Sequence, residues 1–364
     1  MKNVFLISGH YYMSKRKAGF HMLAEAYALA GNKVFFVTAP FSFLFKLRKH
    51  HTNSLKIIKN KFVLCPNNIS CYVHNTPFHI VNFRNPLLNY ITAKLYLLYQ
   101  LFPMRGMKAE IVNADTIIFE STPGLFLFER IKKVNKTAKF IYRVSDDLEL
   151  VGVHPSLVKY ETKILQKFDL VSVASTYVLK KLKKKNPDAN IHLHYHGIKK
   201  QEFDRPHGNP YRENTVNAIF IGVANLDYNS IDIASDLRKD IIFHLIGPLE
   251  QKVIKSNIIY YGEMEFEKTI PYIKYANIAL HTITYSKGIE SLSESSLKSL
   301  QYTYCNLPIV APKFLENKKR KLFIYSNYDE IERIFKDIEE NASIDSGRDM
   351  LRDWSELIPI LDNT

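Results

Sequence analysis

Short runs rich in Val, Ile, Phe and Tyr alternate with segments of helical period along this chain, and the alternation occurs twice. A strand, a crossover helix and another strand make a βαβ unit, so the pattern predicts parallel sheets covered by helices. The first crossover helix is predicted over residues 19–30, before Gly31. In the first half the predicted strands are residues 3–8, 33–38, 116–121, 140–146, 170–174 and 191–195.

A polar stretch with two prolines and a glycine, residues 201–214, separates the first half from a second series of strands. These strands are predicted over residues 218–223, 241–247, 258–262, 278–282, 309–311 and 322–325. A length of 364 residues also favours two domains. We therefore predict an α/β protein with two Rossmann-like domains facing a cleft. The first domain is expected over residues 1–205 and the second over 206–345, with a helix in 346–364 packing back across both.

The charge balance narrows the choice of partner. Lysine and arginine outnumber aspartate and glutamate by 14, and such a field attracts nucleotide phosphates, nucleic acid or anionic lipid headgroups. The three cysteines show no Cys-x-x-Cys spacing, which fits ordinary thiols in a reducing compartment. The chain opens on an apolar, strand-like segment rather than a secretory signal, so we expect a cytoplasmic protein.

The segment 262–312 carries the strongest chemical signal. It runs from a glycine and an acid at a strand end, through a helix and a strand, to a helix opened by serines. Ser295 and Ser296 are good N-cap residues, and the free amides of a helix start suit a diphosphate, to which Lys298 would add a full charge. For a serine and a lysine in isolation, the commoner arrangement is a serine that caps the helix and a lysine that is solvated. The order of elements around this pair favours a phosphate-binding site instead.

Three stretches together carry a family resemblance. They are Gly262-Glu263 followed about 35 residues later by Ser296-Leu297-Lys298 and Gln301, the N-terminal Arg16-x-Ala18-Gly19-Phe20-His21 after a His10 loop, and Tyr142-Arg143-Val144-Ser145-Asp146-Asp147-Leu148. This combination resembles the GumK-like, xanthan-type bacterial glucuronosyltransferases, which are inverting enzymes of the GT-B fold. The resemblance implies transfer of a sugar from UDP-glucuronate to a lipid-linked or membrane-held glycan during synthesis of a bacterial surface polysaccharide.

The resemblance also implies roles for single residues at the donor site. It directs Glu263 toward ribose or sugar hydroxyls and places Tyr285 near the uracil. The residues expected at the phosphates and the sugar are Ser296, Lys298 and Gln301. Leu297 stands where the family has methionine, which keeps an apolar contact. The loop 222–227 departs from the family pattern as well, and this difference bears on recognition of the base and of the donor sugar.

Asp146 and Asp147 are the candidates for the catalytic base, because the family places an aspartate of this role in the same region. An inverting transfer needs one carboxylate to take the proton of the acceptor hydroxyl. Since side chains alternate along a strand, one of the two should face the cleft, and we favour Asp146, which directly follows the strand. The alternative is that both acids cap the next helix.

No metal or other cofactor is expected. The chain has no Asp-x-Asp triplet, so Lys298 and a helix dipole are expected to neutralise the diphosphate. His192, His194 and His196 alternate along a predicted strand without an acid or cysteine beside them, which argues against zinc.

Two basic, aromatic-rich regions, residues 40–60 and 87–108, are predicted to lie in the headgroup layer of an anionic inner membrane. The alternative is that their apolar faces belong to the core of the first domain. The lysine run 180–185 keeps a nucleic-acid-binding protein as a remote possibility, although no nucleic-acid module is present. A nucleotide-sugar epimerase or another GT-B enzyme is the nearer alternative. A retaining enzyme is disfavoured, since Glu290 and Glu294 are four residues apart instead of eight.

Overall fold

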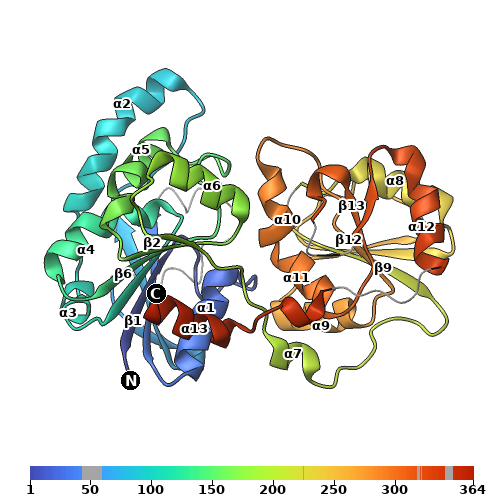
Figure 1. The fold of residues 1–364 in the computed structure, drawn as a ribbon, viewed down its shortest axis with the longest axis horizontal. Coiled ribbons are helices and arrows are strands. Elements are labelled where there is room, and N and C mark those ends of the chain that lie inside the picture. Colours follow the sequence, from blue (N-terminus) through green and yellow to red (C-terminus); the bar gives the residue numbers. More distant parts are fainter. Residues whose placement is uncertain (43–59, 224, 318–319, 321, 341–346) are drawn as a thin grey trace. The chain divides into compact units, whose positions relative to one another are not determined.

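The computed structural model describes residues 1–42, 60–223, 225–317, 320, 322–340 and 347–364. The chain divides into two compact units, of which the first is Met1–Tyr195 with Trp354–Thr364 and the second is His196–Asp353 (Figure 1). The second unit therefore begins ten residues before the predicted boundary at residue 205. Contacts around Asp204 explain the difference, because its carboxylate accepts a hydrogen bond from Tyr304 Oη at 2.8 Å.

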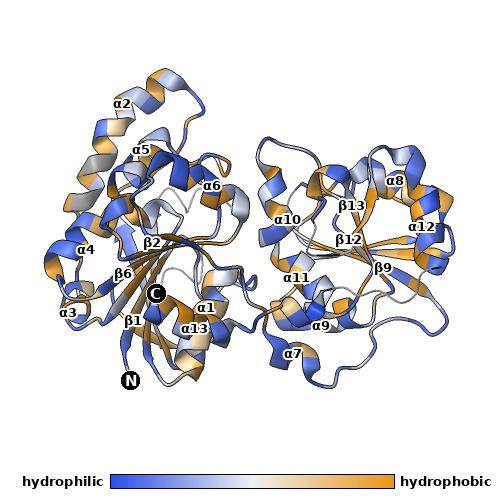
Figure 2. Ribbon diagram, in the orientation of Figure 1, coloured by the Kyte–Doolittle hydropathy of each residue, from blue (hydrophilic) through white to orange (hydrophobic). Residues whose placement is uncertain are grey.

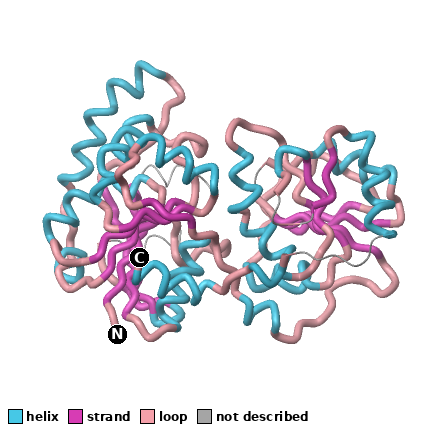
Figure 3. Tube along the Cα trace, viewed as in Figure 1, coloured by secondary structure: helices cyan, strands magenta, loops and turns pink. Residues whose placement is uncertain are grey.

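The first unit is built on one sheet of eight strands in the order β3-β4-β2-β1-β5-β6-β7-β8. All neighbours are parallel except β3 and β4. The strands are β1 (Asn3–Ser8), β2 (Lys33–Ser42), β3 (Val63–Cys65), β4 (Ile69–Thr76), β5 (Thr116–Glu120), β6 (Lys139–Val144), β7 (Leu170–Val173) and β8 (Ile191–Leu193). Helices lie on both faces of this sheet (Figure 3).

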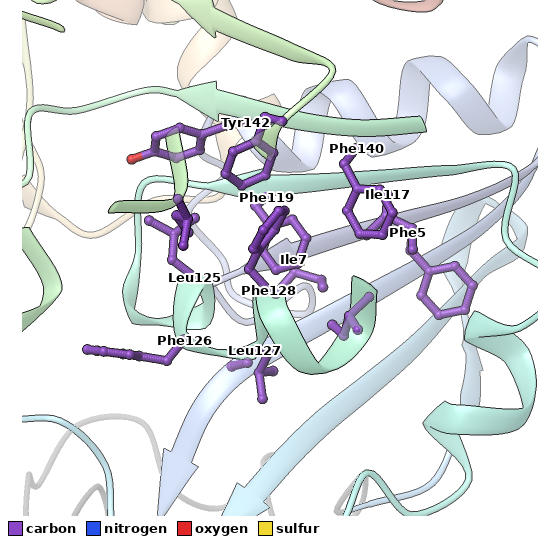
Figure 4. Close-up of a cluster of buried hydrophobic side chains, with 14 of the residues drawn as sticks. Phe5, Ile7, Ile117, Phe119, Leu125, Phe126, Leu127, Phe128, Phe140 and Tyr142 are labelled. Atoms are coloured by element: carbon purple, nitrogen blue, oxygen red, sulfur yellow. The ribbon is translucent and has the colours of Figure 1, made fainter. Parts of the chain in front are cut away.

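The helices of the first unit are α1 (Gly19–Leu29), α2 (Pro86–Leu97), α3 (Met107–Ile111), α4 (Phe128–Val134), α5 (Pro155–Ile164), α6 (Thr176–Lys185) and α13 (Trp354–Asn363). Aromatic side chains fill the space between sheet and helices, and Figure 4 shows Phe119, Phe128 and Phe140 meeting there. The rings of Phe119 and Phe128 lie 5.8 Å apart at a steep angle, an edge-to-face contact that stabilises aromatic cores.

Helix α13 packs on α1 and belongs to the first unit. Its Asp362 carboxylate accepts hydrogen bonds from Tyr27 Oη at 2.9 Å and from Lys2 Nζ at 2.6 Å. Leu361 on the same helix is fully buried. These contacts attach the chain's final helix to its first helix.

The second unit has a six-stranded parallel sheet in the order β11-β10-β9-β12-β13-β14. The strands are β9 (Val216–Ile221), β10 (Ile241–Ile246), β11 (Ile258–Gly262), β12 (Ile278–Leu280), β13 (Ile309–Pro312) and β14 (Leu322–Tyr325). The helices are α7 (Lys200–Asp204), α8 (Tyr228–Leu237), α9 (Phe266–Lys274), α10 (Leu292–Ser295), α11 (Leu297–Tyr304) and α12 (Ile331–Glu340). Apolar residues concentrate on the strands and polar residues on the outer faces of the helices (Figure 2).

Strand order shows where each sheet can bind a ligand. In a doubly wound sheet the crevice lies at the carboxyl ends of the two strands between which the strand order reverses. In the second sheet these are β9 and β12, and in the first they are β1 and β5. The loops after these four strands are therefore the places to look for chemistry.

All twelve predicted strands are present, several of them with ends shifted by one to four residues. The structure adds β3 and β4, which the sequence pattern did not indicate. Seven predicted strands run past their observed carboxyl ends, and one of these, predicted to residue 146, stops at Val144. The backbone N–H of Asp146 donates to Ser121 Oγ at 3.0 Å instead of continuing the sheet.

Candidate active site

Three glycines lie at the carboxyl edge of the second sheet, after β9, after β10 and at the end of β11. Gly247 has φ +143°, and a Cβ built on it would lie 1.7 Å from the carbonyl oxygen of Gly222. Gly247 N–H in turn donates to Gly262 O at 2.8 Å. A side chain at residue 247 is therefore excluded, and the edge stays open to a ligand that approaches the backbone closely.

Lys298 points its ammonium at this edge. Its Nζ lies 4.0 Å from the centre of the Phe220 ring and 3.4 Å from a Cβ built on Gly222. Within the described part of the chain no side chain or carbonyl forms an ion pair or hydrogen bond with this Nζ. Burial lowers the pKa of Lys298 to about 7. A half-buried cation without an anionic partner is suited to receive an anion from outside.

The two serines before Lys298 differ in their roles. Ser295 ends α10, and its hydroxyl donates to Ser291 O at 3.0 Å, so its prediction as an N-cap is wrong. Ser296 is the N-cap of α11, yet its buried hydroxyl makes no capping hydrogen bond. Leu297 opens α11, and Gln301 follows one turn later on the same face.

His281 and Arg320 belong to the same surroundings, and the sequence analysis missed both. His281 follows β12, and its Nε2 is buried without a hydrogen-bond partner among the described residues. Burial, with smaller contributions from the charges of Lys298 and Arg320, holds the pKa of His281 well below its ordinary value. Arg320 donates to Ser299 Oγ, in the first turn of α11, at 2.8 Å. His281 lies near the carboxyl end of the predicted strand 278–282. Because ligands bind at the carboxyl ends of parallel strands, this position could have indicated it from the sequence.

The other predicted donor residues are more exposed. Glu263 follows β11 and is exposed. Tyr285 is 61% exposed, donates from its hydroxyl to Glu290 Oε1 at 3.2 Å, and packs edge-on against Phe314. Both therefore lie on the surface of the second unit, where a ligand can reach them.

The loop after β9, which departs from the family pattern, forms a wall of a hollow of about 550 Å³. Its lining includes Asn225, Tyr228, Pro248, Lys252 and Thr284. The backbone N–H of Thr284 donates to Asn225 O at 2.8 Å, which joins this loop to the residue before Tyr285. The hollow adjoins the glycine edge, because Val223 lines it and Gly222 is the preceding residue.

In the first unit the two predicted acids have separate environments. Asp147 is buried, and its carboxylate pairs with Lys181 Nζ at 2.5 Å and accepts from Glu149 N–H at 3.0 Å. Asp146 is exposed and forms no ion pair with Lys or Arg in the described chain. Desolvation by nearby protein raises the pKa of Asp146, and the charge of His10 opposes this effect. Of the two carboxylates, that of Asp146 is thus the one that a substrate can contact.

The described ranges, with the gaps given above, contain no group of three or more His, Cys, Asp or Glu side chains arranged to hold a metal ion. In the same ranges no helix is long and apolar enough to cross a membrane. The region predicted over residues 40–60 falls largely outside the described residues, and so does Ala224.

Comparison with known proteins agrees with these observations. Residues 6–174 match the family described as "Glucuronosyltransferase GumK, N-terminal domain". The chain is 26% identical over 323 residues to the UDP-glucuronate:glycolipid 2-beta-glucuronosyltransferase of Xanthomonas campestris pv. campestris, and the match spans 88% of this chain and 79% of that protein.

Solved structures agree on the fold. Sucrose-phosphate synthase from Thermosynechococcus elongatus superposes with a TM-score of 0.71 at 12% identity, covering 100% of this chain and 98% of that one. A glycosyltransferase from Rickettsia africae gives 0.57 at 12% identity, covering 99% and 93%. The predicted fold and enzyme class are confirmed, and the predicted resemblance is found again: this chain is a glycosyltransferase of the GT-B fold that is similar to the GumK glucuronosyltransferase.

Proposed function

We propose that the protein is an inverting glucuronosyltransferase that uses UDP-glucuronate and a glycolipid acceptor in the synthesis of a bacterial surface polysaccharide. The relative in Xanthomonas campestris pv. campestris is matched over most of both chains, and its name gives UDP-glucuronate as the donor and a glycolipid as the acceptor, which supports this donor and this acceptor class. The observation that carries the donor half is the half-buried Lys298 side chain, whose ammonium lies beside the glycine edge and suits a diphosphate.

In the proposed reaction the acceptor oxygen bonds to the anomeric carbon while the bond from that carbon to the UDP oxygen breaks. The electron pair of the broken bond leaves with UDP, and the acceptor proton passes to Asp146. Asp147 is the weaker candidate because Lys181 occupies its carboxylate. Lys298 neutralises the leaving diphosphate, and Ser296 donates its unused hydroxyl to it. This charge stabilisation makes a divalent ion unnecessary in our proposal.

The remaining donor residues follow the same assignment. Gln301 lies one turn along α11 from Leu297, so both face the same side of the helix start. Glu263, exposed after β11, is assigned to ribose or sugar hydroxyls, and the exposed ring of Tyr285 to the uracil. The hollow beside Tyr285 and Thr284 gives the nucleoside or the sugar a place next to the diphosphate.

We further propose that α2 lies on the cytoplasmic face of the inner membrane and brings the enzyme to its acceptor. This helix is inverted in polarity: Asn89 is buried, while Leu87 and Tyr90 are 67% and 78% exposed. Asn89 Nδ2 donates to Asn82 Oδ1 at 2.9 Å, so the polar side chain has its partner inside the unit. Figure 2 shows apolar residues along α2, where it extends from the rest of the first unit.

The basic residues next to α2 indicate which kind of lipid surface this helix would bind. The exposed basic residues on and around this helix are Arg84, Lys94, Arg105 and Lys108. An apolar surface flanked by cations binds best to a layer of anionic lipid. The nucleic-acid alternative gains no support, since Lys181 and Lys185 of the lysine run pair with Asp147 and Glu149.

A donor screen tests the function. The purified protein with detergent, a glycolipid acceptor and a panel of UDP-sugars should consume UDP-glucuronate in preference to the others, and Lys298→Gln should weaken donor binding. Consumption of another UDP-sugar in place of UDP-glucuronate would show that the proposed donor is wrong. Transfer by Asp146→Asn at the wild-type rate would remove Asp146 as the base.

A flotation assay tests the membrane surface. Vesicles containing phosphatidylglycerol should carry the wild-type protein, whereas neutral phosphatidylcholine vesicles should not. The double change Leu87→Ser and Tyr90→Ser should abolish flotation, while Leu237→Ser, which changes an exposed leucine of the second unit, serves as a matched control. Equal flotation of both variants would refute the role of α2.

A further inference from the structure

Two helices of the second unit meet at a single residue. Helix α10 ends at Ser295 and α11 begins at Leu297, so Ser296 caps the end of one helix and the start of the other. The backbone of Ser296 is extended, with φ −67° and ψ 115°. The chain therefore turns at Ser296 instead of continuing as one helix.

The local sequence does not impose this break. Residues 292–304 contain neither glycine nor proline, the two residues that most strongly interrupt a helix. Serine is a residue type that favours a helix start, but the hydroxyl of Ser296 makes no capping hydrogen bond. The cause of the break must therefore lie elsewhere in the fold.

The break separates backbone groups that a continuous helix would pair. In such a helix the carbonyl oxygens of Ser293 and Glu294 would accept from the N–H groups of Leu297 and Lys298, four residues further on. Among the described residues, neither of these two N–H groups has a hydrogen-bond partner. They are the amides at the start of α11, where the proposed function places the diphosphate of the donor.

Side chains from beyond β13 take the two carbonyl oxygens instead. Arg320 Nη2 donates to Glu294 O at 3.2 Å, and Arg320 Nη1 donates to Ser293 O at 3.3 Å. Asn317 Nδ2 also donates to Ser293 O, at 2.7 Å. These contacts satisfy the acceptors that would otherwise draw the two amides into a continuous helix.

Arg320 also contacts the other side of the break. Its Nη1 donates to Ser299 Oγ at 2.8 Å, and Ser299 is buried in the first turn of α11. One planar guanidinium thus contacts the end of α10 and the start of α11 together. Because Lys298 is the residue before Ser299, this contact also fixes the turn that carries Lys298.

We propose that Arg320 is a positioning residue of the donor site: it keeps α10 and α11 separate, so that the amides of Leu297 and Lys298 stay available to the diphosphate. The inference rests on the proposed function, in which the donor binds at the start of α11. Arg320 acts through the two helices and needs no contact with the donor. Without it the helices join, the two amides bond to the carbonyl oxygens of α10, and the anion site closes.

The binding of UDP, measured by isothermal titration calorimetry, tests this role. Arg320→Met keeps an apolar stem and removes every donor, and it should raise Kd at least about tenfold, the loss expected for one charge-assisted hydrogen bond. Arg238→Met is the matched control and should bind UDP as the wild type does. Arg238 lies before β10, at the amino edge of the same sheet, and pairs with Asp240 and Glu339. Equal Kd for Arg320→Met and the wild type would overturn the inference.

A second substitution distinguishes this role from a direct contact with the donor and from a general loss of stability. Leu297→Pro forbids a joined helix, because the proline ring clashes with the carbonyl four residues earlier, yet proline suits the first position of α11. This change should weaken UDP binding by itself, since one amide is lost. Adding Arg320→Met should then change Kd less than about twofold. A further loss of about tenfold in this background would contradict the inference.

Amide hydrogen exchange observes the break directly. In the free wild-type protein the amides of Leu297 and Lys298 should exchange quickly, and UDP should slow them. In Arg320→Met both should be protected without UDP, because they are bonded within the joined helix. Fast exchange of both amides in free Arg320→Met would rule out the inference whatever the donor is. Failure of the proposed donor site is a different result, in which Lys298→Gln binds UDP as tightly as the wild type.

Discussion

Raising the pH from about 6 to about 8.5 should weaken the binding of a UDP-sugar to the second unit through one residue, Lys298. Burial lowers the pKa of the unliganded lysine to about 7. A diphosphate against the ammonium should restore the pKa toward its ordinary value near 10.4. The donor then binds with uptake of a proton wherever the free lysine is neutral, at about 0.9 proton per site near pH 8.

The size of the effect follows from the two pKa values. Each pH unit between them costs about 1.4 kcal/mol of binding free energy, so Kd should rise roughly 30-fold between about pH 6 and pH 8.5. Below about pH 6.5 the lysine is already charged, and Kd should become flat. Holding the unpaired ammonium in this site costs on the order of 3–5 kcal/mol, allowing for some solvent contact, and the diphosphate offsets that cost.

Isothermal titration calorimetry in phosphate and Tris buffers measures the affinity and the proton uptake together. Lys298→Gln should bind weakly at every pH, with heats that agree between the buffers. Lys268→Gln, which changes a largely exposed lysine paired with Glu265, should behave as wild type. Equal Kd at both pH values and equal heats in both buffers for the wild-type protein would refute the reasoning.

Three further predictions have separable outcomes. Asp146→Asn should lower kcat by about 10²–10⁴ at unchanged stability, whereas Asp147→Asn should cost about 1–3 kcal/mol in urea unfolding with kcat nearly kept; the reverse pattern would exchange their roles. Gly247→Ala should weaken donor binding and lower Tm, because its Cβ meets a carbonyl oxygen, whereas Gly208→Ala has open space and should change neither. Leu361→Ala should lower the free energy of unfolding by about 2–5 kcal/mol, and a loss below about 1 kcal/mol would contradict its burial.

The parallel sheets were predictable because apolar runs and helical periods alternate regularly, and every strand predicted on this basis is present. Strand β4 was missed because its segment mixes Ser70, His74 and Asn75 with apolar residues. It forms a strand because β2 pairs with it and both of its faces are largely buried. Such support comes from tertiary contacts, which a local pattern does not contain.

The candidate site was predictable in part. Asp146 and Lys298 follow from the family motifs, and the structure distinguishes Asp146 from Asp147 by the position of Lys181, which lies 34 residues further along the chain. The break between α10 and α11 was not predictable, because residues 292–304 contain no glycine or proline. The contacts at this break come from Arg320, which lies beyond β13 in the sequence.

Helix α13 has a consequence for synthesis of the chain on the ribosome. The segment Trp354–Thr364 completes the first unit, although the whole second unit precedes it in the sequence. Trp354, Leu357 and Leu361 of α13 are buried in the finished structure, so the surface of α1 on which this helix packs must stay uncovered while residues 196–353 are being made. The nascent first unit exposes apolar surface during this interval, which is when we expect it to need a chaperone.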